Sequence, residues 1–364
     1  MSLLYDEGQQ AIATESRRVL DARSDKARLL GLIEQTGVID TAWWDTAREQ
    51  GWTALAAPEE HGGLGLGLVE LGLVAQAAGA ATAGAPFLTA GYGVTRALLA
   101  AESSDTTAHW LAALASGEAT GAVAFAEQQA PLPQRPLVRF AGGKLNGTKH
   151  GVVGGAKADI ALVLALSDEG PCLVLAELAA MTPPAIASYD PARCSADLTF
   201  ADTPATLLLN GPGVGAAALD IMAAMAVVTA HEQVGGAEAL MGIARDYALT
   251  RKAFGQPIGA FQSIKHRIAE LYGLIEIARA NAIDAASKDG TPAFFRAAAA
   301  ARLSATEAYD TAARDCVQIH GGIGVTWETG LHLHMRRARS LAVEQGNMLW
   351  WEDRLVTDLD GGLE

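Results

Sequence analysis

Cysteine and charged side chains are both scarce in this sequence. Its 364 residues include 3 cysteines. Because Cys172, Cys194 and Cys316 are far apart and odd in number, neither a disulfide framework nor a zinc-binding CxxC pair is expected. Charged residues make up 19% of the chain, whereas about a quarter is usual in soluble domains. The low value indicates that part of the surface is covered in an assembly.

Long apolar runs and a leader segment are also missing. No stretch approaches the roughly 18 uninterrupted apolar residues of a membrane-spanning helix. Met1–Asp6 has neither the basic nor the apolar part of a signal peptide. The formal net charge of −14 argues against a nucleic-acid-binding groove. We therefore expect a cytoplasmic protein that binds neither membranes nor nucleic acids.

The spacing of apolar residues changes twice along the chain. Residues 1–120 and 213–364 have apolar residues three and four positions apart, as helices do, whereas 121–212 has short apolar runs between turn residues. This order predicts an α+β fold with three domains at these boundaries. Strands are expected at 122–125, 160–166, 172–175, 198–200 and 206–209, and long C-terminal helices at 215–250, 258–288, 292–319 and 330–355.

Glycine-rich positions indicate where the chain turns. Gly142-Gly143 and Asn146-Gly147 suit tight hairpin turns in the β segment. The glycine-rich run 62–67 has no strand before it and no Lys-Ser/Thr pair after it, so a connection between helices is favoured over a phosphate-binding loop.

Two motifs in the C-terminal segment contain residues suited to binding a dinucleotide. They read Arg251-Lys252-Ala253-Phe254-Gly255-Gln256-Pro257-Ile258-Gly259-Ala260-Phe261-Gln262-Ser263-Ile264-Lys265-His266 and Gln318-Ile319-His320-Gly321-Gly322-Ile323-Gly324. The planar guanidinium of Arg251 matches a phosphate with two hydrogen bonds. Gly321 and Gly322 allow close backbone approach to a ligand, and a helix after them could offer free N–H groups to an anion. The alternative is that Arg251 pairs with an acidic residue and the glycines only turn the chain.

These motifs, RxxFGxPIxxFQxxxH and QxxGGxG, resemble those of the acyl-CoA dehydrogenase family, and the order of helices and strands is similar. The resemblance implies an N-terminal helical domain, a β-barrel-like middle domain and a C-terminal four-helix bundle. It implies a flavoprotein oxidoreductase of fatty acid or steroid side-chain β-oxidation, with FAD as cofactor and an electron-transfer flavoprotein as electron acceptor. In the family, one subunit's motifs reach the adenine and pyrophosphate end of FAD held by another. The cofactor-binding residues implied here are Arg251, Phe254, Phe261, Gln262, Gln318, Gly321 and Gly322.

The elements that hold the flavin ring in this family are altered here. Where the family has TEPxAGSD, this chain keeps only Glu127, and the small AGSD turn is absent. At the second element, KxWIT, Gly151 stands at the aromatic position and Val153 at the hydroxyl position. Because a stacking surface and a hydrogen-bond donor are lost together, the resemblance implies a lost flavin-ring site.

The catalytic carboxylate of the family is also missing. Gln345 occupies the usual position of the glutamate, and an amide cannot accept the α-proton of an acyl-CoA. Met225 occupies the alternative position that some members use, on an apolar face expected to pack in the core. Glu344 is a weak candidate, because one residue along a helix rotates a side chain by about 100°. Glu232 lies two helical turns beyond Met225, about 10 Å away.

The remaining candidate side chains favour structural roles. His332 and His334 are two positions apart and point to different sides of a helix, so no metal site is expected. Arg336, Arg337 and Arg339 form a basic cluster that is either solvated, subunit-facing or in contact with CoA phosphate.

Three hypotheses follow. The first is a subunit of a hetero-oligomeric, α2β2 acyl-CoA dehydrogenase that acts on a bulky acyl-CoA, lacks the base and shares FAD with an unlike second subunit. This arrangement resembles that of bacterial steroid-degrading members of the family. The second is a homo-oligomeric FAD enzyme that uses Glu344 as a displaced base. The third is a flavin-free scaffold of the same fold.

Overall fold

The computed structural model describes residues 5–83 and 86–361, so most of the Met1–Asp6 segment lies outside the described residues. The chain divides into two compact units. The first unit comprises Met1–Gly31, Leu68–Ala83 and Ala226–Glu364, and the second comprises Leu32–Gly67 and Gly84–Met225. The three-domain division at 120/121 and 212/213 stays a prediction.

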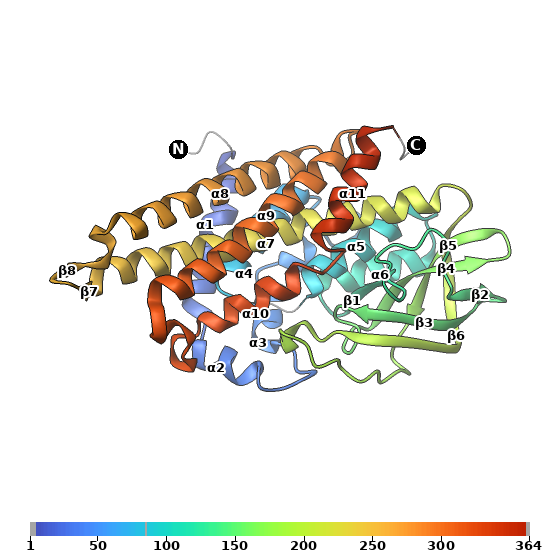
Figure 1. Ribbon diagram of the computed structural model, residues 1–364. Helices are drawn as coiled ribbons and strands as arrows, with labels where there is room; N and C mark the ends of the chain where they lie inside the picture. Colours follow the sequence, from blue (N-terminus) through green and yellow to red (C-terminus); the bar gives the residue numbers. More distant parts are fainter. Residues whose placement is uncertain (1–4, 84–85, 362–364) are drawn as a thin grey trace. The chain divides into compact units, whose positions relative to one another are not determined.

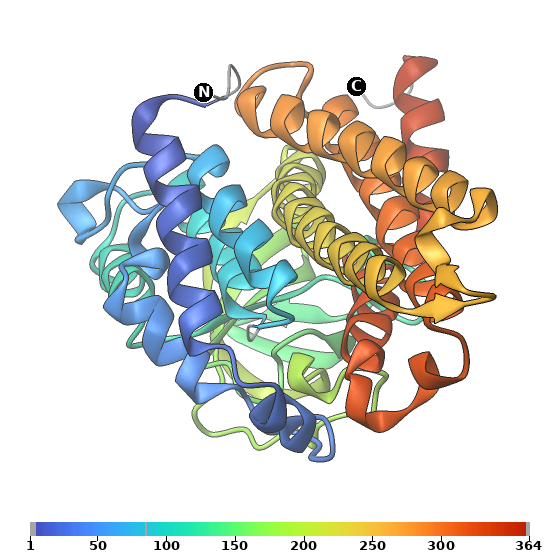
Figure 2. The same ribbon diagram turned by 90° about the vertical axis from the view of Figure 1, so that its left-hand side faces the viewer.

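The first unit is helical. Its helices are α1 (Glu7–Arg23), α4 (Leu68–Ala80), the part of α7 (Val214–Thr250) from Ala226 onward, α8 (Gln262–Ser287), α9 (Phe294–His320), α10 (Leu331–Leu341) and α11 (Met348–Leu359). The short α2 (Lys26–Leu32) begins in this unit. Helices α8 and α9 pack along each other, and α1 packs on α4 (Figures 1 and 2). Asp6 caps α1 through a hydrogen bond from the Gln9 N–H, which fixes where this helix begins.

The second unit contains a small β-barrel and the helices that pack on it. The strands are β1 (Gly121–Ala124), β2 (Arg139–Ala141), β3 (Lys144–Val152), β4 (Ile160–Ser167), β5 (Gly170–Glu177) and β6 (Ala196–Asn210). The order β4-β2-β3-β6-β5 closes on itself through β4–β5 pairing, and β1 adds to β4 in parallel. The unit's helices are α3 (Thr41–Glu49), α5 (Phe87–Ala100), α6 (Asp105–Ser116) and the start of α7. Helix α5 packs on β1.

The expected strands are present with two differences. The runs 198–200 and 206–209 belong to one long strand, β6, because it continues through 201–205 while pairing with β3 and β5. The expected turn at Asn146-Gly147 is wrong: both residues lie inside β3, at a register shift where Gly147 has φ of 125°. The turn at Gly142-Gly143 is confirmed and joins β2 to β3.

The expected long helices are confirmed as α7, α8 and α9, but the one expected at 330–355 is wrong. It is divided into α10 and α11 by a turn at residues 342–347. Gln345 has φ of 54° and Gly346 φ of 97°, and a Cβ on Gly346 would lie 2.9 Å from the Trp350 ring. The left-handed backbone at these two residues ends the helix.

Helix α7 is the longest element, with 37 residues, and is largely apolar. Its length and composition would suffice to cross a membrane, but 72% of its most apolar stretch is buried inside the protein. Ile221, Met222, Met225 and Val228 are all buried, as expected for a core face. Within the first unit, Gly79 of α4 lies against the Glu232 carbonyl and Gly235 of α7 lies against the Gln76 carbonyl. A Cβ at either glycine would fall within 2 Å of these oxygens, so only glycine permits this close packing.

Two buried histidines predict that the protein loses stability in acid. Burial, with a smaller effect of the Arg337 charge, lowers the pKa of His334 to about 3. Burial also lowers the pKa of His231 to about 4. Between these values and about 6.5 the unfolded chain binds protons that the folded chain does not. The free energy of unfolding should therefore fall as pH falls below about 6.5, by up to about 1.4 kcal/mol per pH unit for each histidine.

Urea unfolding between pH 4 and pH 7 measures this slope. In His334→Gln, unfolding should take up about one proton fewer, so the free energy of unfolding should change less steeply with pH. His109→Gln, at an exposed histidine, is the control. Equal slopes in the wild-type and His334→Gln proteins would contradict the assignment.

Candidate functional site

The first motif forms a hairpin between α7 and α8. The short strands β7 (Lys252–Ala253) and β8 (Gln256–Pro257) pair in antiparallel fashion (Figure 1). Phe254, at the tip of the hairpin, has φ of 52° and is 95% exposed. Its ring centroid lies 6.2 Å from that of Phe261, the residue that precedes α8. Arg251 and Gln262 are exposed, so both can contact a ligand or another chain.

The second motif lies at the C-terminal end of α9. Gln318 is exposed in the last turn of this helix, and Gly321 ends it with φ of 64°. Gly321 and Gly322 are exposed, and a Cβ on either would meet no atom within 4 Å. The element that follows is η5 (Gly321–Val325), a 3₁₀ helix of 5 residues, instead of a helix. A 3₁₀ helix this short has little of the dipole that would attract an anion to the start of an α-helix. The open backbone at the two glycines is therefore the feature suited to a ligand.

A residue that the sequence analysis overlooked joins the two motifs. Tyr247 lies one helical turn before Arg251 on α7, and its ring stacks on His320 with centroids 4.1 Å apart and planes at 21°. The Tyr247 hydroxyl donates a weak hydrogen bond of 3.5 Å to the His320 carbonyl. His320 therefore does more than turn the chain. The i, i+4 spacing of Tyr247 and Arg251 was the signal available in the sequence, because such residues share one helix face.

The exposed groups of the two motifs fit one end of a dinucleotide. Arg251 forms no ion pair with an acidic residue in the described part of the chain. Its guanidinium is therefore available for a pyrophosphate, and the pairing considered from sequence is not found. The glycines leave an open backbone surface, and Gln262 and Gln318 offer amide groups for an adenine or ribose. These residues would hold that end of FAD.

Glu127, the residue that matches the family's flavin-ring element, forms a buried ion pair in the barrel. Glu127 accepts a hydrogen bond of 2.6 Å from Lys149 Nζ, and these side chains are 3% and 0% exposed. The carboxylate also accepts from the N–H groups of Leu137 and Val138. Burial opposes ionisation of Glu127, but these donors hold its pKa below the usual value. Burial lowers the pKa of Lys149 to about 8. Both carboxylate oxygens of Glu127 are therefore hydrogen-bonded within the barrel.

Gln345 is part of a hydrogen-bonded turn. Its side-chain oxygen accepts from the Thr229 hydroxyl of α7 at 3.0 Å. The turn is held from α9 by Arg302, which is 1% exposed and donates to the carbonyls of Leu341 and Glu344. Arg302 also donates to the Gln233 side chain at 2.8 Å. Gln345 is therefore held in place by the turn, and its assignment to the position of the family's glutamate stays a prediction.

The two alternative carboxylates are both buried. The helical rotation argument against Glu344 is wrong, because residues 342–345 form a turn. Glu344 is instead 6% exposed. Burial lowers the pKa of Arg302 to about 10, and the nearby charge of Glu344 opposes this shift. Glu232 is also 6% exposed and forms an ion pair of 2.7 Å with Arg337 of α10. Glu232 and Arg337 thus neutralise each other inside the first unit.

The remaining candidates have separate structural partners. The His334 ring is hydrogen-bonded to the Tyr309 hydroxyl at 2.9 Å, and His332 stacks on Trp327. The basic cluster is not one surface, because Arg337 is buried whereas Arg339 is 52% exposed and pairs with Asp310.

The order of N-terminal helices, a small β-barrel and C-terminal helices, with two exposed motifs at the end of α7 and α9, is what comparison with known proteins tests. The N-terminal domain of acyl-CoA dehydrogenases matches residues 6–118, and the C-terminal domain matches residues 213–348. The chain is 35% identical over 314 residues to the acyl-CoA dehydrogenase IpdE2 of Mycobacterium tuberculosis, covering 85% of this chain and 84% of that protein. The chain belongs to the acyl-CoA dehydrogenase family, a family of oxidoreductases.

Solved structures share the fold. The ChsE4–ChsE5 complex from Mycobacterium tuberculosis matches with a TM-score of 0.88 and 23% identity over 99% of both chains. A variant of the Tcur3481–Tcur3483 steroid acyl-CoA dehydrogenase matches with a TM-score of 0.87 and 24% identity over 98% of both chains. These matches confirm the α+β architecture of helices, barrel and helices.

Proposed function

We propose that this chain is the base-lacking subunit of a hetero-oligomeric acyl-CoA dehydrogenase. In this assembly it supplies the adenine and pyrophosphate end of an FAD site, and an unlike subunit holds the flavin ring and the catalytic carboxylate. The observation that carries the proposal is the contrast between an open, preorganised half-site and a base position filled by Gln345 within a hydrogen-bonded turn.

The half-site residues support a shared cofactor because they face outward. The guanidinium of Arg251 and the glycine turn at Gly321 are exposed and joined through Tyr247 and His320. A site of this kind is incomplete in one chain, since only one end of a dinucleotide would be held.

Exposed apolar side chains near the two motifs support the idea that another chain covers this part of the surface. Four large apolar side chains on the joined elements are at least half exposed, namely Leu249, Phe254, Ile323 and Val325. Exposed apolar groups gathered near a site are typical of protein interfaces. Two solved structures of this fold are complexes of two differently named chains, and one is described as a steroid acyl-CoA dehydrogenase. By analogy we propose an α2β2 assembly in the cytoplasm that acts on a bulky acyl-CoA.

The division of labour follows from the side chains. FAD held by Arg251, Gln262, Gln318 and the glycine turn would supply the hydride acceptor for the β-carbon of the acyl chain, and a carboxylate would be needed to remove the α-proton. In this chain Gln345 cannot take that proton, and Arg251 with the glycine turn would bind and orient the cofactor. An electron-transfer flavoprotein is the proposed electron acceptor.

Co-expression tests the proposal. We expect the chain purified alone to show no flavin absorption. Co-expressed with an unlike acyl-CoA dehydrogenase subunit from the same organism, the chain should co-purify in a 1:1 ratio with bound FAD. Flavin in the isolated chain that is reduced by an acyl-CoA would favour the homo-oligomer with Glu344 as base. A colourless protein under both conditions would favour the flavin-free scaffold.

The Glu344→Gln variant of the complex separates the first two hypotheses further. It preserves the shape of the side chain beside Arg302 and removes its ability to take a proton. Turnover should be unchanged if the base lies in the other subunit. A loss of turnover with full flavin content would identify Glu344 as the base.

Tyr247 is expected to act as a positioning residue for the half-site. Tyr247→Leu removes the stack on His320, so FAD should bind the complex about three- to tenfold more weakly, as expected for loss of an aromatic pair. Tyr247→Phe keeps the ring and should bind nearly as the wild type does. Flavin fluorescence of the stripped and reconstituted complex measures the affinity. Tyr272→Leu on α8, where the ring is 57% exposed, is the control, and equal effects of Tyr247→Leu and Tyr272→Leu would contradict the role.

A further inference from the structure

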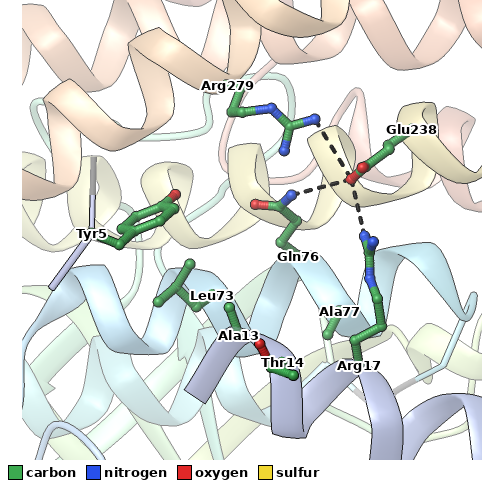
Figure 3. Close-up of a pocket in the computed structure, with 9 residues that line it drawn as sticks. All are labelled: Tyr5, Ala13, Thr14, Arg17, Leu73, Gln76, Ala77, Glu238 and Arg279. Atoms are coloured by element: carbon green, nitrogen blue, oxygen red, sulfur yellow. Dashed lines mark hydrogen bonds and ion pairs between the residues drawn. The ribbon is translucent and has the colours of Figure 1, made fainter. Parts of the chain in front are cut away.

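The first unit contains a pocket whose lining includes no residue of the two motifs. Its volume is about 320 Å³, at the lower end of the range for small-molecule sites. Residues of α1, α4, α7 and α8 line it, together with Tyr5 (Figure 3). The side chains that matter for its chemistry are Tyr5, Arg17, Leu73, Gln76, Glu238 and Arg279.

The polar groups of the pocket converge on one carboxylate oxygen. Glu238 Oε2 accepts hydrogen bonds from Arg17 at 3.1 Å and from the Gln76 amide at 3.3 Å. The same oxygen lies 3.6 Å from Nη2 of Arg279. Glu238 therefore holds two guanidinium groups at one end of the pocket, as Figure 3 shows.

The pocket has more hydrogen-bond donors than acceptors. Each guanidinium has five N–H donors, and three donor groups already share one oxygen of Glu238. Glu276 does not line the pocket. It accepts a hydrogen bond from Arg279 through Nε only, at 3.2 Å. The lining holds two arginines and one glutamate, and Glu276 beside it pairs with Arg279. The charges therefore balance, and what the pocket offers a ligand is the remaining N–H donors of Arg279.

A phenol and an apolar wall complete the pocket. The Tyr5 hydroxyl is buried and has no hydrogen-bond partner within residues 5–83 and 86–361. Burial raises the pKa of Tyr5, and the charge of Arg279 opposes this shift, so the hydroxyl stays a donor at neutral pH. Leu73 is only 4% exposed and contributes a hydrocarbon surface.

We propose that this pocket binds a small organic monocarboxylate. Its carboxylate group accepts hydrogen bonds from Arg279 and Tyr5, and its hydrocarbon part lies against Leu73. The apolar wall at Leu73 favours such a ligand over inorganic phosphate, which has no hydrocarbon part. This site does not depend on the proposed sharing of FAD.

Calorimetric titration of the full-length protein with sodium hexanoate tests the site. We expect saturable binding with one site per chain, and at least about tenfold weaker binding by Arg279→Gln, since the loss of one charge-assisted contact has this size. Arg17→Gln should also weaken binding. Arg18→Gln is the matched control, because Arg18 neighbours Arg17 on α1, is 67% exposed and pairs with Glu15. Its affinity should equal that of the wild type.

Titrations with two further ligands and with one further variant test which chemical groups the pocket recognises. Equal affinity for 1-hexanol would overturn the role of the charge, and equal affinity for phosphate would overturn the role of Leu73. Absence of saturation with hexanoate would overturn the site itself. If Arg279→Gln does not fold, Arg17→Gln decides, because Arg17 is 50% exposed. Tyr5→Phe should weaken binding by about two- to tenfold, the effect of one lost hydrogen bond.

Discussion

A complex that carries Arg251→Ala should be purified with less than about one tenth of the FAD of the wild-type complex. The guanidinium can give a pyrophosphate two charge-assisted hydrogen bonds, each of about 1.5–3 kcal/mol, and about 1.4 kcal/mol corresponds to a tenfold change in affinity. Arg251 is exposed and follows directly on the last residue of α7. Its removal should therefore leave the fold intact. Flavin absorbance per complex, with subunit stoichiometry from light scattering, gives the result.

The matched control is Arg245→Ala. Arg245 lies on the same helix, is 61% exposed and pairs only with its neighbour Asp246 among the described residues. The Arg245→Ala complex should retain its full flavin content. Unchanged flavin in Arg251→Ala would contradict the role of Arg251, whereas a loss of flavin in both variants would point to a general effect of charge. Arg251→Lys should give an intermediate content, because an ammonium cannot bind a phosphate bidentately.

Arg337→Ala should lower the free energy of unfolding by about 3–5 kcal/mol, the usual effect of breaking a buried ion pair. It removes the guanidinium that neutralises Glu232 inside the first unit. It also removes the donor to the carbonyl of Ala83, which follows α4. Urea unfolding followed by circular dichroism measures the change.

A neighbouring arginine on α10 provides the control. Arg339 is 52% exposed and pairs with Asp310, so Arg339→Ala should change stability by less than about 1 kcal/mol. The double variant Glu232→Met with Arg337→Met should recover much of the loss, because it leaves no unpaired buried charge. A loss below about 1 kcal/mol in Arg337→Ala would show that the buried pair does not stabilise the unit.

Most of the fold could be predicted because its elements have strong local patterns. The long helices α7, α8 and α9 follow from the three- and four-residue spacing of apolar residues. The break at Gln345-Gly346 has a local signal that the apolar spacing outweighed: Gly346 has a positive φ, and Asn347 caps α11 through a hydrogen bond from the Trp350 N–H. The contacts of the turn with Thr229 and Arg302 depend on the tertiary fold. The bulge at Gly147 was hidden, because an Asn-Gly pair suits a turn as well as an irregular strand.

The candidate site was predicted in part. The motif residues could be selected from the resemblance, but their exposure and the link through Tyr247 depend on how α7 and α9 pack. The basic cluster shows the limit of sequence reasoning most clearly. Arg337 and Arg339 are two residues apart, and one is buried against Glu232 while the other is on the surface.

The ion pair of Glu127 and Lys149 gives this glutamate a structural role that does not depend on a cofactor. The carboxylate ties the end of β1 to residues 137 and 138 through two N–H groups, and it neutralises a lysine that the barrel fully encloses. Losing this glutamate would destabilise the barrel whether or not a flavin is ever bound. The presence of this glutamate in the chain is therefore accounted for by the barrel alone and does not by itself indicate a bound flavin ring.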